Sequence, residues 1–205
     1  VGATLTDTFT YTISDGNGAT DTTTLTITIT GTNDLPTAVA DTASITEDSV
    51  TPITGVLTTN DTDVDSNDVL TVIDIDGVSN PASAVSGSFG NLGWGENGNY
   101  SYTLDNSNTA VQALAAGESI TDVFNYTISD GQGGTSTSSL TVTITGTNDL
   151  PTAVADTATI AEDAVAPATG DLTANDIDLD TTDTLTVLNI DGQTNDAVNI
   201  SGDFG

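Results

Sequence analysis

No carboxylate in this chain can be neutralised by a basic side chain of the same chain. The 205 residues include 30 Asp and Glu and no Lys, Arg or His, so the formal net charge is −30. Two carboxylates about 4 Å apart repel by roughly 4 kcal/mol at an effective dielectric of about 20. A fold that gathers these groups must therefore leave them in water or place a cation among them.

The acids are concentrated in a stretch that occurs twice, NDTDVDSND at residues 60–68 and NDIDLDTTD at residues 175–183. Carboxylate and amide oxygens with flexible spacing suit Ca²⁺ better than any transition metal. We therefore predict two calcium loops. Their candidate ligands are Asn60, Asp61, Asp63, Asp65 and Asp68 in the first, and Asn175, Asp176, Asp178, Asp180 and Asp183 in the second.

The stretch is not an EF-hand. Ser66 and Thr181 stand where that loop needs Gly, and Val72 and Val187 stand where it needs Glu. The alternative interpretation is a solvated acidic loop that binds no ion.

The chain repeats itself with a period of 115 residues. YTISDGNG begins at Tyr11 and YTISDGQG at Tyr126, and both copies of GTNDLPTAVADTA are displaced by the same 115 positions, from Gly31 to Gly146. A period of this length fits one small domain.

The turn residues of GTNDLP mark the best domain boundary. Residues 1–33 are then the C-terminal strands of one repeat, 34–148 one complete repeat, and 149–205 the N-terminal part of the next. We expect that neither partial piece closes a core alone, and that the natural protein continues at both ends.

Hydrophobic residues between the acidic loops alternate with a period of two, which indicates β-strands. TTTLTITIT at residues 22–30 and FTYTI at residues 9–13 show this pattern, as do their copies at 137–145 and 124–128. GWGENGNYSYTL predicts a hairpin with its turn near Asn97–Gly98. LTVIDI predicts a bulge at Val72–Ile73.

Seven or eight short strands in about 115 residues predict an all-β fold of tandem Ig-like β-sandwiches. The one helical pattern is TAVQALAAG at residues 109–117, in which Val111 and Leu114 are three residues apart and Gly117 could end a helix.

A second group of acids lies where consecutive repeats meet or in the turns of each repeat. An ion held by two neighbouring repeats would remove hinge freedom, because binding to the docked state alone stabilises that state. The alternative for NDLP is an Asx turn before proline without metal. The candidate ligands in this group are Asn33, Asp34, Asp41, Asn148, Asp149, Asp156, Asp15, Asp130, Glu47 and Glu162.

Composition also excludes functions. Without a basic residue nothing can contact nucleic-acid phosphate, and without His, Cys or Lys no Ser or Thr is activated as a nucleophile in the usual way. No catalytic or cofactor-binding residue is predicted, although a two-carboxylate glycosidase remains formally open. No apolar run approaches the roughly 18 residues of a membrane span.

Two rival functions remain open. One is a ligand-binding adhesive module that recognises carbohydrate through the Trp94 hairpin or ice through outward threonine rows. The other treats the acids as salt adaptation without specific ion sites.

Residues 95–151 resemble the VCBS repeat of giant bacterial surface proteins, in the YSYTLD strand, the VQALAAGE turn, the FNYTISDG strand and the closing TGTNDLP. Residues 38–72, with the NDTDVD loop, are similar to the bacterial cadherin-like repeats that often accompany it.

This resemblance implies a cadherin-like sandwich in a calcium-stiffened extender of a secreted or cell-surface adhesin of the RTX type. It further implies type I secretion and a role in attachment or biofilm formation, with calcium ions and neighbouring repeats of the same chain or filament as partners. By position it carries the metal role to Asp61, Asp63 and Asp65 and their copies, and less directly to the Asn-Asp pairs of the linkers.

Overall fold

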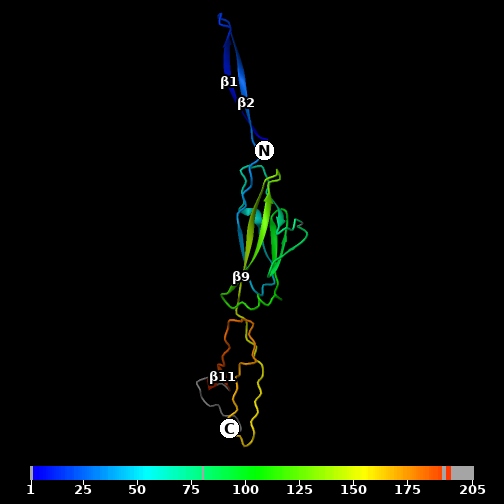
Figure 1. Cartoon of the computed structure of the whole chain (residues 1–205), viewed down its shortest axis with the longest axis vertical. Coiled ribbons are helices and arrows are strands. Elements are labelled where there is room, and N and C mark those ends of the chain that lie inside the picture. Colours follow the sequence, from blue (N-terminus) through cyan, green and yellow to red (C-terminus); the bar gives the residue numbers. More distant parts are fainter. Residues whose placement is uncertain (1, 80, 191–192, 195–205) are drawn as a thin grey trace.

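The computed structural model describes residues 2–79, 81–190 and 193–194. Figure 1 shows a long rod in which a two-stranded hairpin, a sandwich and an extended C-terminal segment follow one another. The regular elements of the described residues are strands, apart from one 3-10 turn. No helix in the described residues has the length and apolarity that a membrane crossing requires.

Eight strands between residues 41 and 145 form a sandwich of two four-stranded sheets, with orders β3-β10-β9-β5 and β4-β8-β7-β6. β3 pairs parallel with β10, and the other pairs are antiparallel. The predicted all-β sandwich is confirmed. The elements are β3 (Asp41–Thr46), β4 (Ile53–Val56), η1 (Leu57–Thr59), β5 (Thr71–Ile75), β6 (Val85–Ser86), β7 (Gly90–Trp94), β8 (Asn99–Leu104), β9 (Ser119–Ser129) and β10 (Thr135–Thr145).

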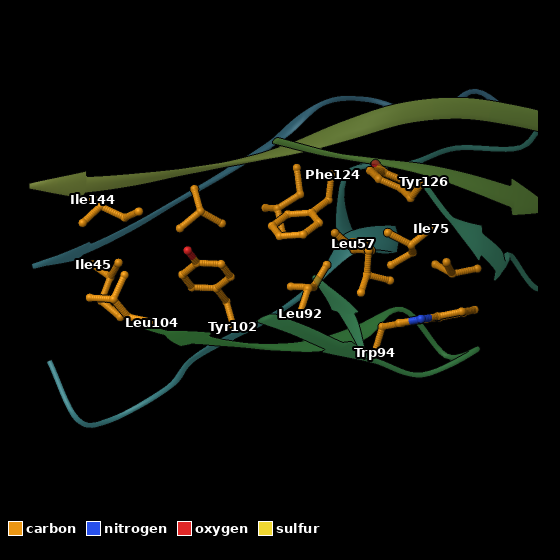
Figure 2. Packing of buried hydrophobic residues seen from close by; sticks show 14 of the residues in the cluster. Ile45, Leu57, Ile75, Leu92, Trp94, Tyr102, Leu104, Phe124, Tyr126 and Ile144 are labelled. Carbon is orange, nitrogen blue, oxygen red and sulfur yellow. The ribbon is translucent and has the colours of Figure 1, made fainter. Parts of the chain in front are cut away.

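The core lies between the two sheets, as the alternation predicted (Figure 2). Phe124, Tyr126 and Ile128 point inward from β9 and are at most 1% exposed. Tyr102 from the opposite sheet meets Phe124 edge-on, with ring centroids 6.0 Å apart. Trp94 and Tyr102 are also buried in this core, so neither ring is open for stacking on a sugar.

Two local predictions are confirmed and one is wrong. The register of β5 against β9 shifts between Val72 and Asp74, which is the expected bulge. β7 and β8 form the expected hairpin, with Gly98 at a φ of 81°. TAVQALAAG forms successive turns and no helix, within a crossover loop (residues 105–118) that passes from β8 in one sheet to β9 in the other.

The segments on either side of the sandwich, where the structure describes them, do not close a core of their own. β1 (Thr4–Ser14) and β2 (Thr20–Thr30) form a hairpin in which every residue is exposed. Leu25 of β2 is 51% exposed, whereas Leu140, its copy in β10, is fully buried. After residue 149 the described residues contain only β11 (Asn189–Ile190) and β12 (Gln193–Thr194) as strands.

Candidate metal centre at the repeat junctions

Three carboxylates from three parts of the chain meet at the end of the sandwich where β3 and β10 finish. Glu47 follows β3, Asp149 lies in the linker, and Asp180 belongs to the second acidic loop. One carboxylate oxygen of each lies within 4.8 Å of the other two. This junction therefore joins the sandwich to the segment that follows it.

Two of these side chains are buried, with Glu47 2% and Asp180 1% exposed. Oε1 of Glu47 accepts hydrogen bonds from the backbone N–H and the hydroxyl of Thr147. Oδ2 of Asp180 accepts the backbone N–H of Asp149 at 2.8 Å. These contacts fix both carboxylates at the junction.

The other oxygen of each buried carboxylate has no partner. Oε2 of Glu47 and Oδ1 of Asp180 are buried without a hydrogen bond. Burying charged oxygens unpaired is costly, and in this chain no basic side chain can compensate. A hard cation with oxygen ligands such as Ca²⁺ fits this donor set.

The charges at the junction also favour a cation. Burial raises the pKa of Asp149, and the neighbouring carboxylates Asp48, Asp180 and Asp178 raise it further. Asp48 was not among the predicted ligands. Its position beside Glu47 in the sequence was the available signal, and its φ of 59° is unusual for a residue other than glycine.

The first acidic loop brings together a second group. One oxygen each of Asp63, Asp65 and Asp68 lies within 4.8 Å of the other two. The loop is shaped by local bonds, since the Asp65 N–H donates to Oδ1 of Asp63 at 2.8 Å. Oδ2 of Asp63 and Oδ2 of Asp68 are buried and have no hydrogen-bond partner. Burial and the charges of Asp65, Asp63 and Asp130 raise the pKa of Asp68.

The linker before the sandwich contacts this group. The Asp34 N–H donates to Oδ2 of Asp65 at 2.9 Å, which is the contact that Asp149 makes with Asp180 at the other junction. Asn33 donates from Nδ2 to Oδ2 of Asp130 at 2.7 Å. That bond, with N–H groups of the β9–β10 turn, holds the pKa of the Asp130 carboxyl below its usual range despite burial.

Other predicted ligands lie apart from these two groups and hold the chain entering β3. Nδ2 of Asn60 donates to the carbonyls of Val39 and Ala40, and Oδ1 of Asp61 accepts the Val39 N–H at 2.7 Å. Asp41 accepts a hydrogen bond from the Tyr126 hydroxyl at 2.9 Å.

The second acidic loop repeats this arrangement. Asn175 donates to the Ala155 carbonyl and Asp176 accepts the Val154 N–H. In both copies, the Asn-Asp pair at the start of the acidic loop thus holds the segment after the linker by hydrogen bonds to its backbone.

The remaining candidates are dispersed. Oδ1 of Asp15 accepts N–H groups in the exposed turn of the β1–β2 hairpin. Asp156, Glu162 and Asp183 are exposed. Nδ2 of Asn148 donates to the Asp149 carbonyl. Oδ1 of Asp178 accepts the Asp180 N–H. None of Asp15, Asp156, Glu162 and Asp183 belongs to a carboxylate group described above.

Comparisons with known proteins agree with this architecture. A family model of the bacterial cadherin-like domain matches residues 33–146, and a model of a bacterial Ig domain matches residues 2–28. No curated protein matches.

Solved structures with a similar course of the chain include two cadherins and an enzyme. A structure of protocadherin gamma B7 extracellular domains has a TM-score of 0.41 and 13% identity, covering 76% of this chain and 36% of that one. The human desmocollin-1 ectodomain has a TM-score of 0.35 and 12% identity, covering 72% of this chain and 29% of that one. An endo-fucoidan hydrolase of glycoside hydrolase family 107 has a TM-score of 0.30 and 15% identity, covering 67% of this chain and 22% of that one. This chain therefore spans about a third of the length of the protocadherin chain and less of the other two.

Proposed function

The chain belongs to the bacterial cadherin-like domain family, and from that premise we propose that it is a calcium-stiffened extender segment of a secreted or cell-surface bacterial adhesin, without catalytic activity. The observation that supports this function is the junction of Glu47, Asp149 and Asp180. Its carboxylates come from the sandwich, the linker and the following segment, and two of them, Glu47 and Asp180, each bury one oxygen without a hydrogen-bond partner.

A cation at this junction would act mechanically. Glu47 and Asp180 would hold it between the repeats, with Asp149 between them, and Ca²⁺ would supply the positive charge that cancels their repulsion. Because the ion binds only when the two repeats are docked, it stabilises the docked arrangement by about 2.7 kcal/mol at a hundredfold excess over its dissociation constant. Extracellular calcium modules bind at roughly 10⁻⁴–10⁻³ M.

The proposed repeat unit is residues 34–148, with 1–33 belonging to the preceding repeat and 149–205 to the following one. Export by type I secretion and a role in attachment or biofilm formation follow from the resemblance to RTX adhesins. In this proposal the partners of the segment are its neighbouring repeats and calcium.

A second candidate function has one observation in its favour. The β1–β2 register places threonines in two adjacent rows on one face of the hairpin. Thr6 pairs with Thr28, Thr8 with Thr26 and Thr10 with Thr24. An uncharged hydroxyl face of this kind is a candidate surface for carbohydrate or ice. Specific binding of the isolated chain on a glycan array or in an ice-affinity assay would favour this module over the extender.

The extender is tested on the whole 205-residue chain by melting and small-angle X-ray scattering, in calcium and in chelator. Calcium is expected to raise the melting temperature and to give the scattering of a stiff rod, whereas chelator should give the scattering of a more flexible chain. Identical curves in both conditions would overturn the proposal. If sodium chloride reproduced the full calcium effect, salt adaptation without specific sites would be the better explanation.

A further inference from the structure

The crossover loop (residues 105–118) lies at the same end of the sandwich as the Glu47 junction. The backbone carbonyl of its last residue, Glu118, accepts a hydrogen bond from the N–H of Gly146 at 3.0 Å, directly before the linker. In Figure 1 it is the green loop at the lower end of the sandwich, next to the start of the C-terminal segment. This position lets it touch whatever follows the linker.

The loop is anchored firmly to the sandwich. Val111 is fully buried and Leu114 is 6% exposed, and both belong to the core. Nδ2 of Asn106 donates to the Ser49 carbonyl at 3.2 Å, which ties the loop to the turn after β3. The loop can therefore serve as a fixed surface.

The loop also holds a junction carboxylate. Nε2 of Gln112 donates to Oδ1 of Asp48 at 3.1 Å. Asp48 directly follows Glu47, and one carboxylate oxygen of Glu47 lies within 4.8 Å of one of Asp149 in the linker. Gln112 thus orients a negative group that faces the linker.

A second contact reaches the following repeat itself. The hydroxyl of Thr181, in the second acidic loop, donates to the Ala113 carbonyl at 3.4 Å. The equivalent position of the first acidic loop, 115 residues earlier, also carries a hydroxyl, Ser66. Neither partner of this contact is a candidate metal ligand.

We propose that the crossover loop is a metal-independent docking surface for the acidic loop of the following repeat, with the Ala113 carbonyl receiving Thr181 and Gln112 positioning Asp48 beside the linker. The inference rests on the proposed extender function, in which that repeat docks at this junction. The cation draws the two repeats together, and the loop sets the orientation in which they meet.

The test measures calcium binding and the distance between repeats separately. The chain has no cysteine, so Thr54→Cys and Ala174→Cys place two spin labels on either side of the junction. Thr181→Val removes the hydroxyl without touching the sandwich core, and Gln112→Leu releases Asp48. Calcium affinity is measured by calorimetry and the distance distribution by double electron–electron resonance, in calcium and in chelator.

Contacts made only in the docked state add to apparent calcium affinity. Each variant is expected to lower that affinity about two- to tenfold, as for one modest hydrogen bond, with unchanged stoichiometry. The distance distribution should broaden in both calcium and chelator. Ser66→Ala is the matched control and should change neither quantity, because the 205-residue chain has no crossover loop before the first junction.

Unchanged affinity and distances in Thr181→Val and Gln112→Leu would overturn the inference. Failure of the unsubstituted chain to bind calcium, combined with broadened distances in the variants, would overturn the proposed function and support the loop as a docking surface.

Discussion

Glu47 and Glu162 occupy equivalent positions, 115 residues apart, in different surroundings. Glu47 is buried because Thr147, at the end of β10, closes over it with two hydrogen bonds. Glu162 follows a segment that has no β10 beside it and is exposed. Similar local sequences thus lead to a candidate ligand in one copy and a solvated side chain in the other.

Glu47→Gln is expected to weaken calcium binding on the order of tenfold, because ligand charge count sets the affinity of such sites. In chelator the same variant should be at least as stable as the unsubstituted chain, since it removes an unpaired buried charge. Calorimetric titration and thermal melting measure the two effects. Glu162→Gln is the control, and an equal effect of both substitutions would contradict the assignment of Glu47.

Asp41 permits a prediction on pH. Burial raises its pKa, a hydrogen bond from Tyr126 opposes this, and the charge of Asp61 adds to the increase. The folded state therefore holds the Asp41 proton more tightly than the unfolded chain does. The stability that this proton contributes is present below the unfolded pKa of about 3.9 and is lost as pH rises through the folded pKa.

Asp41→Asn keeps an oxygen acceptor for Tyr126 and removes the charge. In chelator it is expected to be more stable than the unsubstituted chain at pH 7, with the difference vanishing near pH 3.5. Urea unfolding at the two pH values measures this. A difference of the same size at both would show that the carboxyl titration is not its cause.

At the scale of elements, the parallel pairing of β3 with β10 decides where the junction forms. It brings Thr46 opposite Thr145, so the chain after β3 and the chain after β10 leave the sandwich side by side. Glu47 and the linker meet for this reason. The crossover loop packs over the same end, and Gly146 lies directly beneath it.

Gly146→Ala tests this packing. An added Cβ would lie 2.4 Å from the carbonyl oxygens of both Leu114 and Ala115, which are backbone atoms that cannot rotate away. The substitution is expected to cost about 1–3 kcal/mol, as overpacking does, and to lower the melting temperature accordingly.

Gly31→Ala is the matched substitution in the first copy. Its Cβ would meet only the Ala3 carbonyl oxygen at 3.5 Å, which is ordinary contact. It should leave melting unchanged, and equal destabilisation by both substitutions would contradict the role of the crossover loop.

On the scale of the whole molecule, the rod has one closed hydrophobic core, as far as the described residues show. Its buried members lie between Ile45 and Ile144, with none in the β1–β2 hairpin. The apolar face of that hairpin is open, with Phe9 49% and Ile29 59% exposed. The sandwich is therefore expected to unfold as an independent unit.

Removing residues 1–32 should leave the main melting transition of the sandwich within about 4 °C, the shift that roughly 1 kcal/mol produces in a domain of this size. Asn33 and its bond to Asp130 are kept. Circular dichroism melting compares the two chains. Loss of the cooperative transition would show that the hairpin contributes to the core.

Much of the fold could be predicted because its signals are local. Alternation in β9 and β10, the Asn97–Gly98 turn and the bulge after Val72 each depend on a few adjacent residues. The helix predicted at residues 109–117 failed because Val111 and Leu114, three apart, also suit successive turns that cross between sheets. A spacing of three does not distinguish the two cases.

The candidate site was harder to predict. Asp61 and Asp63 stand two residues apart in the same motif, yet one pins Val39 and the other joins Asp65 and Asp68. Asp48 adjoins the predicted ligand Glu47, but the sequence alone does not show that its charge acts on Asp149, which is 101 residues away (149 − 48).

By itself, the sequence determined that this chain is a β-sandwich repeat whose acids cannot be neutralised internally, because alternation and charge are properties of neighbouring residues. Only the tertiary structure decided which acids meet. Glu47 and Asp180 are 133 residues apart (180 − 47), and they come together through the parallel pairing of β3 with β10 and the course of the linker. Contacts of that separation depend on how strands are ordered in space, which no local pattern records.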